Sequence, residues 1–261
     1  MKLEEMLNKI YLETKNGFEY VKQIPDKSID MILCDLPYGT TACKWDIIIP
    51  FDLLWEQYNR VIKDSGAIAL FGTEPFSSYL RISNLNMFKY DWIWYKNTPC
   101  GFVLAKKQPM RNHEIVSVFY KNQPIYNPIK ENRDHNEDSK KRYKYNFDSI
   151  KGNNKQQGGI KGAKQGKCDE LRFPTSVKYF KNVSRNKMLH PTEKPVALFE
   201  YLIKTYTNEG DTVLDNCIGA GTTAVACKRL NRNFIGMEIY QNYIDISYKR
   251  LLETKQGEGL L

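Results

Sequence analysis

Residues 212–224 read T-V-L-D-N-C-I-G-A-G-T-T-A and decide the fold of this chain. The pattern is that of a short buried strand, a turn with two glycines, and the first residues of a helix. An apolar strand follows, and it ends in Glu238, an acid 23 positions after Asp215. Gly219 and Gly221 let the backbone come close to a ligand, while the acid can accept hydrogen bonds from both hydroxyls of a ribose. The unit therefore predicts a nucleoside site in an α/β fold with a Rossmann-like sheet.

The position of this unit in the chain narrows the choice of nucleoside. A nicotinamide-dependent dehydrogenase starts with such a unit and builds its sheet afterwards, but only about 40 residues follow Gly221 here. The remaining strands have to come from residues 29–120, so we expect a circularly permuted order of motifs. Asp215 at the tip of its strand would repel a pyrophosphate and favours a cationic or neutral group. S-adenosylmethionine, which carries a ribose and positive charges but no phosphate, fits such a site.

A second candidate site follows the apolar run of residues 29–34. Turn residues bound this run, which reads as a buried strand, and Asp35, Leu36, Pro37 and Tyr38 come directly after it. In open α/β sheets, ligands bind at the carboxyl ends of the strands. These four residues are therefore expected at the ligand-binding edge of the sheet.

Strands and helices alternate along the rest of the chain, which is typical of a mainly parallel sheet. Apolar periodicity predicts further strands at residues 67–71, 90–95, 115–120, 212–215 and 233–238. Helical periodicity predicts helices at residues 3–24, 51–63, 75–84, 195–206, 222–230 and 243–252.

The composition changes in residues 121–188, which are rich in Lys, Asn, Gln and Gly. Residues 130–187 hold 16 Lys and Arg against 7 Asp and Glu, a surplus equal to the net charge of +9 of the whole chain. Because Tyr and Phe are interleaved with these bases, the segment suits phosphate contacts and base stacking, and it predicts a nucleic-acid partner. A solvated basic loop without a partner is the alternative. We expect residues 1–120 and 189–261 to form the catalytic and cofactor-binding domain, with 121–188 inserted.

Cysteine usage and hydropathy indicate a cytoplasmic protein. The six cysteines form no C-x-x-C pair, and with only three histidines we expect reduced thiols and no metal site. No apolar stretch approaches the ~18 residues of a membrane span, and the first residues lack the apolar core of a signal peptide.

Four features together resemble the amino-methylating DNA methyltransferases, which act on N6 of adenine or N4 of cytosine. They are D-L-P-Y at 35–38, the basic segment, H-P-T-E-K-P at 190–195 and D-N-C-I-G-A-G-T-T at 215–223. Their order matches the beta class of that family, in which the catalytic motif comes first and the cofactor motif last. N-H-E-I at 112–115 is similar to another piece of the family. The resemblance covers nearly the whole chain outside the basic segment.

The resemblance implies methyl transfer from S-adenosylmethionine to N6 of adenine in double-stranded DNA. Asp35, Leu36, Pro37 and Tyr38 would be the catalytic residues, and residues 121–188 the target-recognition region. A homodimer and a cognate restriction nuclease are further partners that the family suggests. The residues assigned to the cofactor are His190, Lys194, Asp215, Asn216, Cys217, Gly219, Gly221, Thr222 and Glu238.

The chain departs from the family pattern at two places. Leu36 stands where the family usually has proline, but this residue acts through its backbone carbonyl, which leucine also has. Asn216 and Cys217 stand where Pro-Phe is usual, and the loss of the aromatic ring is expected to weaken cofactor binding.

The sequence is also compatible with functions other than adenine methylation. An N4-cytosine methyltransferase is the runner-up within the family, and a DNA-binding protein with a decayed active site is the alternative outside it. The dipeptide Pro99-Cys100 matches the nucleophile of carbon-5 cytosine methyltransferases, but the order of motifs is wrong for that family. We interpret Cys100 as a loop residue.

Overall fold

The computed structural model describes residues 10–14, 20–41, 43, 46–132 and 171–259. These residues belong to two compact units. The larger unit comprises residues 1–127 and 175–261, and the smaller one comprises residues 128–174.

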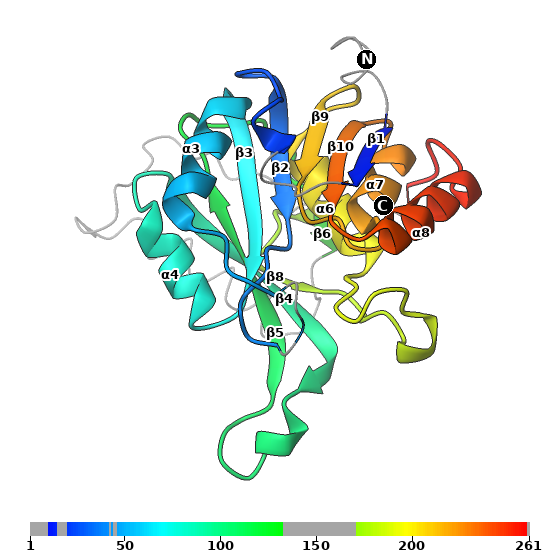
Figure 1. Ribbon diagram of the computed structural model, residues 1–261. Helices are drawn as coiled ribbons and strands as arrows, with labels where there is room; N and C mark the ends of the chain where they lie inside the picture. Colours follow the sequence, from blue (N-terminus) through cyan, green and yellow to red (C-terminus); the bar gives the residue numbers. More distant parts are fainter. Residues whose placement is uncertain (1–9, 15–19, 42, 44–45, 133–170, 260–261) are drawn as a thin grey trace, which may run out of the picture. The chain divides into compact units, whose positions relative to one another are not determined.

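An eight-stranded sheet forms the larger unit (Figure 1). The first five strands in spatial order, β1, β10, β9, β2 and β3, pair in parallel. The next strand, β5, is antiparallel to both of its neighbours, β3 and β4, and β8 is parallel to β4. The predicted α/β class is confirmed, with β5 running against the other strands. In spatial order the strands are β1 Ile10–Thr14, β10 Asn233–Glu238, β9 Thr212–Asp215, β2 Ile29–Cys34, β3 Ile62–Gly72, β5 Arg111–Phe119, β4 Phe88–Cys100 and β8 Val177–Tyr179.

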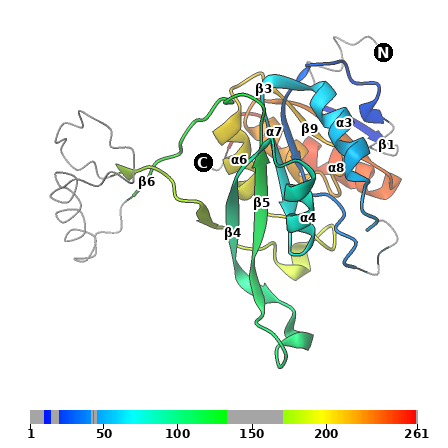
Figure 2. The ribbon, with the colours of Figure 1, turned by 90° about the vertical axis from the view of Figure 1, so that its left-hand side faces the viewer.

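Helices cover both faces of this sheet (Figures 1 and 2). From β2 to β3 the chain moves one way across the sheet through α3, and from β9 to β10 it moves the other way through α7. Because such crossovers are right-handed, α3 and α7 lie on opposite faces, with α4 beside α3, and α6 and α8 beside α7. None of the described helices is long and apolar enough to span a membrane. The helices are α3 Phe51–Val61, α4 Phe76–Ser83, α6 Val196–Tyr206, α7 Thr222–Arg229 and α8 Gln241–Glu253, with short 3-10 turns η1 Phe102–Leu104 and η2 Arg185–Lys187.

Two of the expected helices include residues that form strands in the structure. The helix expected over residues 3–24 is wrong at residues 10–14, which form β1, whereas residues 20–21 are helical; residues 3–9 and 15–19 lie outside the described part. The unpaired edge of β10 offers a row of backbone partners, and pairing with it outweighs the helical spacing of the side chains. The helix expected over 51–63 ends at Val61, and β3 starts at once, at Ile62.

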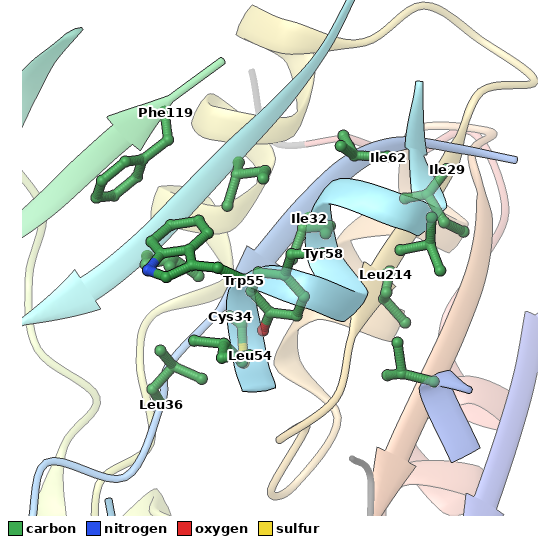
Figure 3. Packing of buried hydrophobic residues seen from close by; sticks show 14 of the residues in the cluster. Ile29, Ile32, Cys34, Leu36, Leu54, Trp55, Tyr58, Ile62, Phe119 and Leu214 are labelled. Carbon is green, nitrogen blue, oxygen red and sulfur yellow. The ribbon is translucent and has the colours of Figure 1, made fainter. Parts of the chain in front are cut away.

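The core between β2 and α3 holds the ligand-binding edge in place (Figure 3). Ile29 and Ile32 of β2 are fully buried, and α3 turns Leu54 and Tyr58 toward them. Burial of each such side chain contributes about 1.5–3 kcal/mol to folding. Trp55 of α3 also donates from its indole Nε1 to Ser83 Oγ at 2.7 Å, which ties α3 to α4.

The chain leaves the larger unit after Asn127 and re-enters it at Thr175. The backbone N–H of Asn127 donates to the carbonyl of Thr205 at 2.8 Å. Its side-chain amide donates to the carbonyls of Lys204 and Thr207, at 3.2 Å each. On re-entry, the carbonyl of Ser176 accepts the N–H of Ile93 at 2.8 Å, and β8 then joins the sheet beside β4. Both crossing points are therefore fixed to the larger unit.

The smaller unit contains a two-stranded ladder of β6 Glu131–Asn132 and β7 Leu171–Arg172. Residues 133–170, with most of the basic surplus, lie outside the described residues. β8 lies within the stretch that composition assigns to an insertion, yet it is a strand of the main sheet. The target-recognition role of this stretch stays a prediction.

Gly221 caps the start of α7 with φ +78°, and a Cβ there would come within 2.5 Å of Ser247 Oγ on α8. We expect Gly221→Ala to lower the free energy of unfolding by about 3 kcal/mol, because left-handed strain adds to a displacement of α8. Gly210→Ala is a matched control, since Gly210 has φ +83° but nothing within 4 Å of the added Cβ. It should lose only the strain, about 1 kcal/mol. Urea unfolding of both variants measures the difference, and equal losses would contradict a packing role for Gly221.

Candidate active site

A cavity of about 760 Å³ is lined by the residues that follow β2, β9 and β10 at their carboxyl ends. All residues that the sequence assigns to catalysis or to the cofactor line this cavity except Gly221, which packs against Ser247 instead. The pairing of β2 with β9 places Asp35 and Asp215 at one edge of the sheet, although 180 positions separate them in the chain.

One end of the cavity is built around Glu238. Its carboxylate accepts the backbone N–H of Gly219 at 3.0 Å and that of Tyr240 at 3.1 Å. These bonds fix the acid against the glycine loop, and each oxygen retains a lone pair for a hydroxyl donor. Burial raises the pKa of Glu238. The ring of His190 lies above Gly219 and meets the ring of Tyr243 edge-on, with 4.5 Å between the centroids.

Asp215 lies under the same loop and is almost completely buried. It accepts hydrogen bonds from the hydroxyl of Thr223 and from the backbone N–H of Cys217, the latter at 3.0 Å. Burial raises its pKa to about 6, so most of the Asp215 carboxyl groups are ionised at neutral pH. Where the glycine loop, β10 and α8 line the cavity, the charged side chains are Asp215 and Glu238, both acidic. This end therefore fits a ribose that carries a positive group, and it would repel a phosphate.

The other end of the cavity is formed by residues 35–38. The Asp35 carboxylate accepts a hydrogen bond from the Tyr38 hydroxyl and forms an ion pair with Lys194. The side chain of Leu36 is only 4% exposed and belongs to the same apolar core as Leu54 (Figure 3). Leucine at this position thus anchors the loop by burial, where a proline would have stiffened it.

Lysines and acids alternate in a buried row that ends at Asp35. Lys96 of β4 pairs with Glu114 of β5, and Glu114 lies 3.4 Å from Lys194 Nζ, which in turn pairs with Asp35. Burial raises the pKa of Asp35, and the charge of Lys194 offsets part of that rise. Burial also disfavours ionised Glu114, but its two lysine neighbours outweigh this and hold its pKa below the ordinary value. For Lys194, the two acids outweigh burial and raise the pKa, so this lysine stays charged.

Most of the chain matches one known protein family. Residues 29–249 match the N6/N4 methyltransferase family, which is described as DNA methylase. The chain belongs to this family of DNA methylases. The family confirms the cofactor expected from the sequence, S-adenosylmethionine, and the cavity end around Glu238 and Asp215 fits it.

Individual relatives of this DNA methylase are similar over most of their length. The type II methyltransferase M.HpaI of Haemophilus parainfluenzae is 30% identical over 90% of this chain and 72% of its own. M.BglII of Bacillus subtilis is 34% identical over 95% of this chain and 70% of its own.

Two solved structures share the fold. The M1.HpyAVI complex with S-adenosylmethionine has a TM-score of 0.62 at 24% identity, covering 93% of this chain and 98% of its own. The cytosine-N4-specific PvuII DNA methyltransferase has a TM-score of 0.65 at 15% identity, covering 92% and 85%.

Lys194, which the sequence assigns to the cofactor, lines the cavity, and its role toward the cofactor stays a prediction. Its ammonium group contacts Asp35 and Glu114, while only its backbone carbonyl lies near the glycine-loop helix, 3.5 Å from Thr222 Oγ1. The contacts favour a role in positioning and charging Asp35. The motif at residues 190–195 predicts that Lys194 lies near the cavity, but it does not predict which acids the ammonium group pairs with.

Two further residues, Glu114 and Asp46, belong to the site, although the sequence assigns neither of them a role there. Glu114 lies within β5, directly before the mostly apolar run of residues 115–119, and a buried acid there requires a cationic partner, which is the signal that points to Lys96 and Lys194. Asp46 accepts the backbone N–H groups of Gly39, Thr40 and Thr41 at 2.8, 2.8 and 2.6 Å. It therefore closes the loop after Tyr38 into a fixed wall of the cavity.

The positions that depart from the family pattern are also built into the structure. The Asn216 amide oxygen accepts the hydroxyl of Tyr58 at 2.5 Å, which links the cofactor loop to α3. Cys217 packs, partly buried, against the apolar core. Three His, Cys, Asp or Glu side chains do not gather as a metal-binding group anywhere in the described residues.

We expect Lys194→Met to move the acidic limb of the pH–rate profile for DNA methylation to higher pH by about 1–3 units. Removal of the cation raises the pKa of Asp35, so the ionised carboxylate is lost earlier as pH falls. Lys96→Met is the matched control, because Lys96 pairs with Glu114, whereas the ion pair of Asp35 is made by Lys194, and it should shift the limb less. Rates of tritiated methyl transfer between pH 5 and 9 measure the limb, and an unmoved limb would show that Lys194 does not control Asp35.

Proposed function

We propose that this DNA methylase transfers a methyl group to the exocyclic N6 of adenine within a specific sequence of double-stranded DNA. The observation that carries the proposal is the position of Asp35, which shares one cavity with the glycine loop and Glu238. S-adenosylmethionine, when bound, supplies an electrophilic methyl group. The residues of this chain then have to hold a base amine in line with it.

The amine of adenine is a poor nucleophile because its lone pair is delocalised into the ring. The Asp35 carboxylate and the Leu36 carbonyl can each accept one N–H of that amine and turn its lone pair toward the methyl group. Such positioning and charge stabilisation can lower a barrier by several kcal/mol. Lys194 supports this role, because its charge favours the ionised form of Asp35 and offsets part of the rise in pKa that burial causes.

The target base has to leave the duplex to reach Asp35, at a cost of a few kcal/mol. Tyr38 lines the cavity next to Asp35 and can stack on the extruded base, which offsets about 1–3 kcal/mol of that cost. Its ring already packs 5.0 Å from Phe76, centroid to centroid, and its hydroxyl is held by Asp35. These contacts hold the ring in place before the base arrives.

The rest of the proposal concerns organisation and partners. Residues 121–188 would read the DNA sequence, and the motif order would be the circularly permuted order of the beta class. The relatives are named type II methyltransferases, which supports a place in a restriction-modification system with a cognate nuclease. The family resemblance suggests a homodimer, and the cysteine usage suggests a cytoplasmic location.

N4-cytosine methylation is the second candidate, because the exocyclic amine of cytosine presents the same two N–H groups to Asp35 and Leu36. The acid as first residue of D-L-P-Y favours adenine by family resemblance. A decayed site is disfavoured, because Lys194 is paired with Asp35 and the Glu238 carboxylate is held by the backbone N–H of Gly219, so both ends of the cavity are ordered.

Asp35→Ala should abolish methyl transfer to DNA and leave the dissociation constant of S-adenosylmethionine within about threefold of wild type, a range below one tenfold step in affinity. Glu238→Ala should weaken the binding of S-adenosylmethionine about tenfold or more, because a partly buried acceptor for the ribose hydroxyls is lost. Isothermal calorimetry and transfer of a labelled methyl group separate the two effects. Undiminished transfer by Asp35→Ala would remove Asp35 from the mechanism.

The methylated base is identified by sequencing DNA from cells that express this protein, with detection of N6-methyladenine and N4-methylcytosine. We expect N6-methyladenine at one recurring sequence. N4-methylcytosine would move the assignment to the second candidate, and unmodified DNA would favour the decayed site.

A further inference from the structure

The hairpin of β4 and β5 projects from the edge of the sheet at which the cavity lies (Figures 1 and 2). β4 is antiparallel to β5, which is antiparallel to β3, so β4 runs in the direction of β2 and β3 and its carboxyl end lies at the same edge. Cys100 and Arg111, at the two sides of the hairpin, line the cavity. The base of the hairpin is therefore a wall of the active site, and its tip extends beyond that wall.

The tip of the hairpin is apolar and exposed. Phe102 is 79% exposed, Val103 93% and Leu104 44%. They form the turn η1, which Gly101 introduces with φ +91° and which is closed by backbone hydrogen bonds from Leu104 to Gly101 and from Ala105 to Phe102. Adjacent exposed apolar side chains on an ordered turn mark a surface that another molecule covers.

The charge of the hairpin indicates which molecule that is. Residues 92–113 contain no Asp or Glu, but they contain Lys96, Lys106, Lys107 and Arg111. Lys106, Lys107 and Arg111 are exposed on either side of the apolar tip. A second copy of this chain would bring the same positive charges against them, which is unfavourable. DNA offers phosphates to the basic residues and stacked bases to the apolar ones.

We propose that Phe102 and Val103 enter the DNA duplex beside the target base and occupy the gap that the base leaves when it moves into the cavity, while Lys106 and Lys107 contact the flanking phosphates. This role rests on the proposed function, since only an enzyme that extrudes its base needs such a wedge. Apolar side chains inserted between base steps are a known way to hold a duplex in an unstacked state. The wedge lowers the free energy of the extruded state and does not touch the reacting atoms.

The test compares two duplexes that carry the recognition sequence mapped by sequencing. In one, the target base is normally paired, and in the other, the partner position is abasic, so that the target base leaves the stack easily. We expect the double variant Phe102→Ala, Val103→Ala to lower kcat/KM about tenfold or more on the paired duplex. On the abasic duplex it should stay within about threefold of wild type, because the extrusion cost is already reduced.

Two controls separate the wedge from a loss of folding. Leu252→Ala removes a side chain that is 86% exposed on α8 and should leave both rates unchanged. The affinity of the double variant for S-adenosylmethionine, measured by calorimetry, should equal that of wild type.

The phosphate contacts are tested separately. Lys106→Gln with Lys107→Gln should weaken DNA binding on both duplexes alike and reduce the slope of log K against log salt by about 2.

Three outcomes would overturn the wedge. They are an unchanged rate of the double variant on the paired duplex, an equal loss on both duplexes, and a loss that accompanies dissociation of a dimer in sedimentation, which would assign the tip to a second copy. In each of these cases wild-type methylation of DNA leaves the proposed function intact. Wild-type protein that methylates no DNA would instead remove the proposed function, and the wedge with it.

Discussion

The parallel pairing of β2 with β9 is the constraint on which the site depends. Its register aligns Met31 with Val213 and Ile32 with Leu214, so the two strands end side by side. One carries Asp35 at its end and the other carries Asp215. The four aligned side chains are fully buried, and the order of the strands therefore cannot change without exposing the core. The pairing of β2 with β9 thus brings together two motifs that lie 180 positions apart in the chain.

Charge organises the site in a second way. The end of the cavity near the glycine loop is acidic, and the end near Asp35 holds an acid that is balanced by Lys194. Glu114 and Lys96 extend this balance to the antiparallel strands β5 and β4, which lie on the far side of β3 from the cofactor loop. Because removal of one partner of a buried ion pair costs about 3–5 kcal/mol, the row couples catalytic geometry to the stability of half the sheet.

The sequence was most informative where a local pattern has one structural solution. The apolar run of β2 and the strand–glycine–helix pattern around Gly219 predicted both the elements and the edge at which they meet. β1 was missed because a five-residue edge strand is decided by its partner β10 and not by its own periodicity. The pairing of Lys194 with Glu114 could not be predicted, since it depends on how β5 aligns with its neighbours. The contact of Gly221 with α8 could not be predicted from the glycine pattern, because it depends on the packing of a later helix; the role of Gly221 toward the cofactor stays a prediction.

The two points at which the chain leaves and re-enters the larger unit have a consequence for the evolution of specificity. Asn127 and Ser176 are each bonded to the sheet-bearing unit, one beside α6 and the other beside β4. The ends of the intervening stretch are thus held by groups that do not depend on what lies between them. A stretch of different length or sequence can be exchanged there without disturbing β2, β9 or the cavity. Under the proposed role of this stretch in reading DNA, replacement of one continuous segment would change the recognition sequence and leave the methylating framework in place.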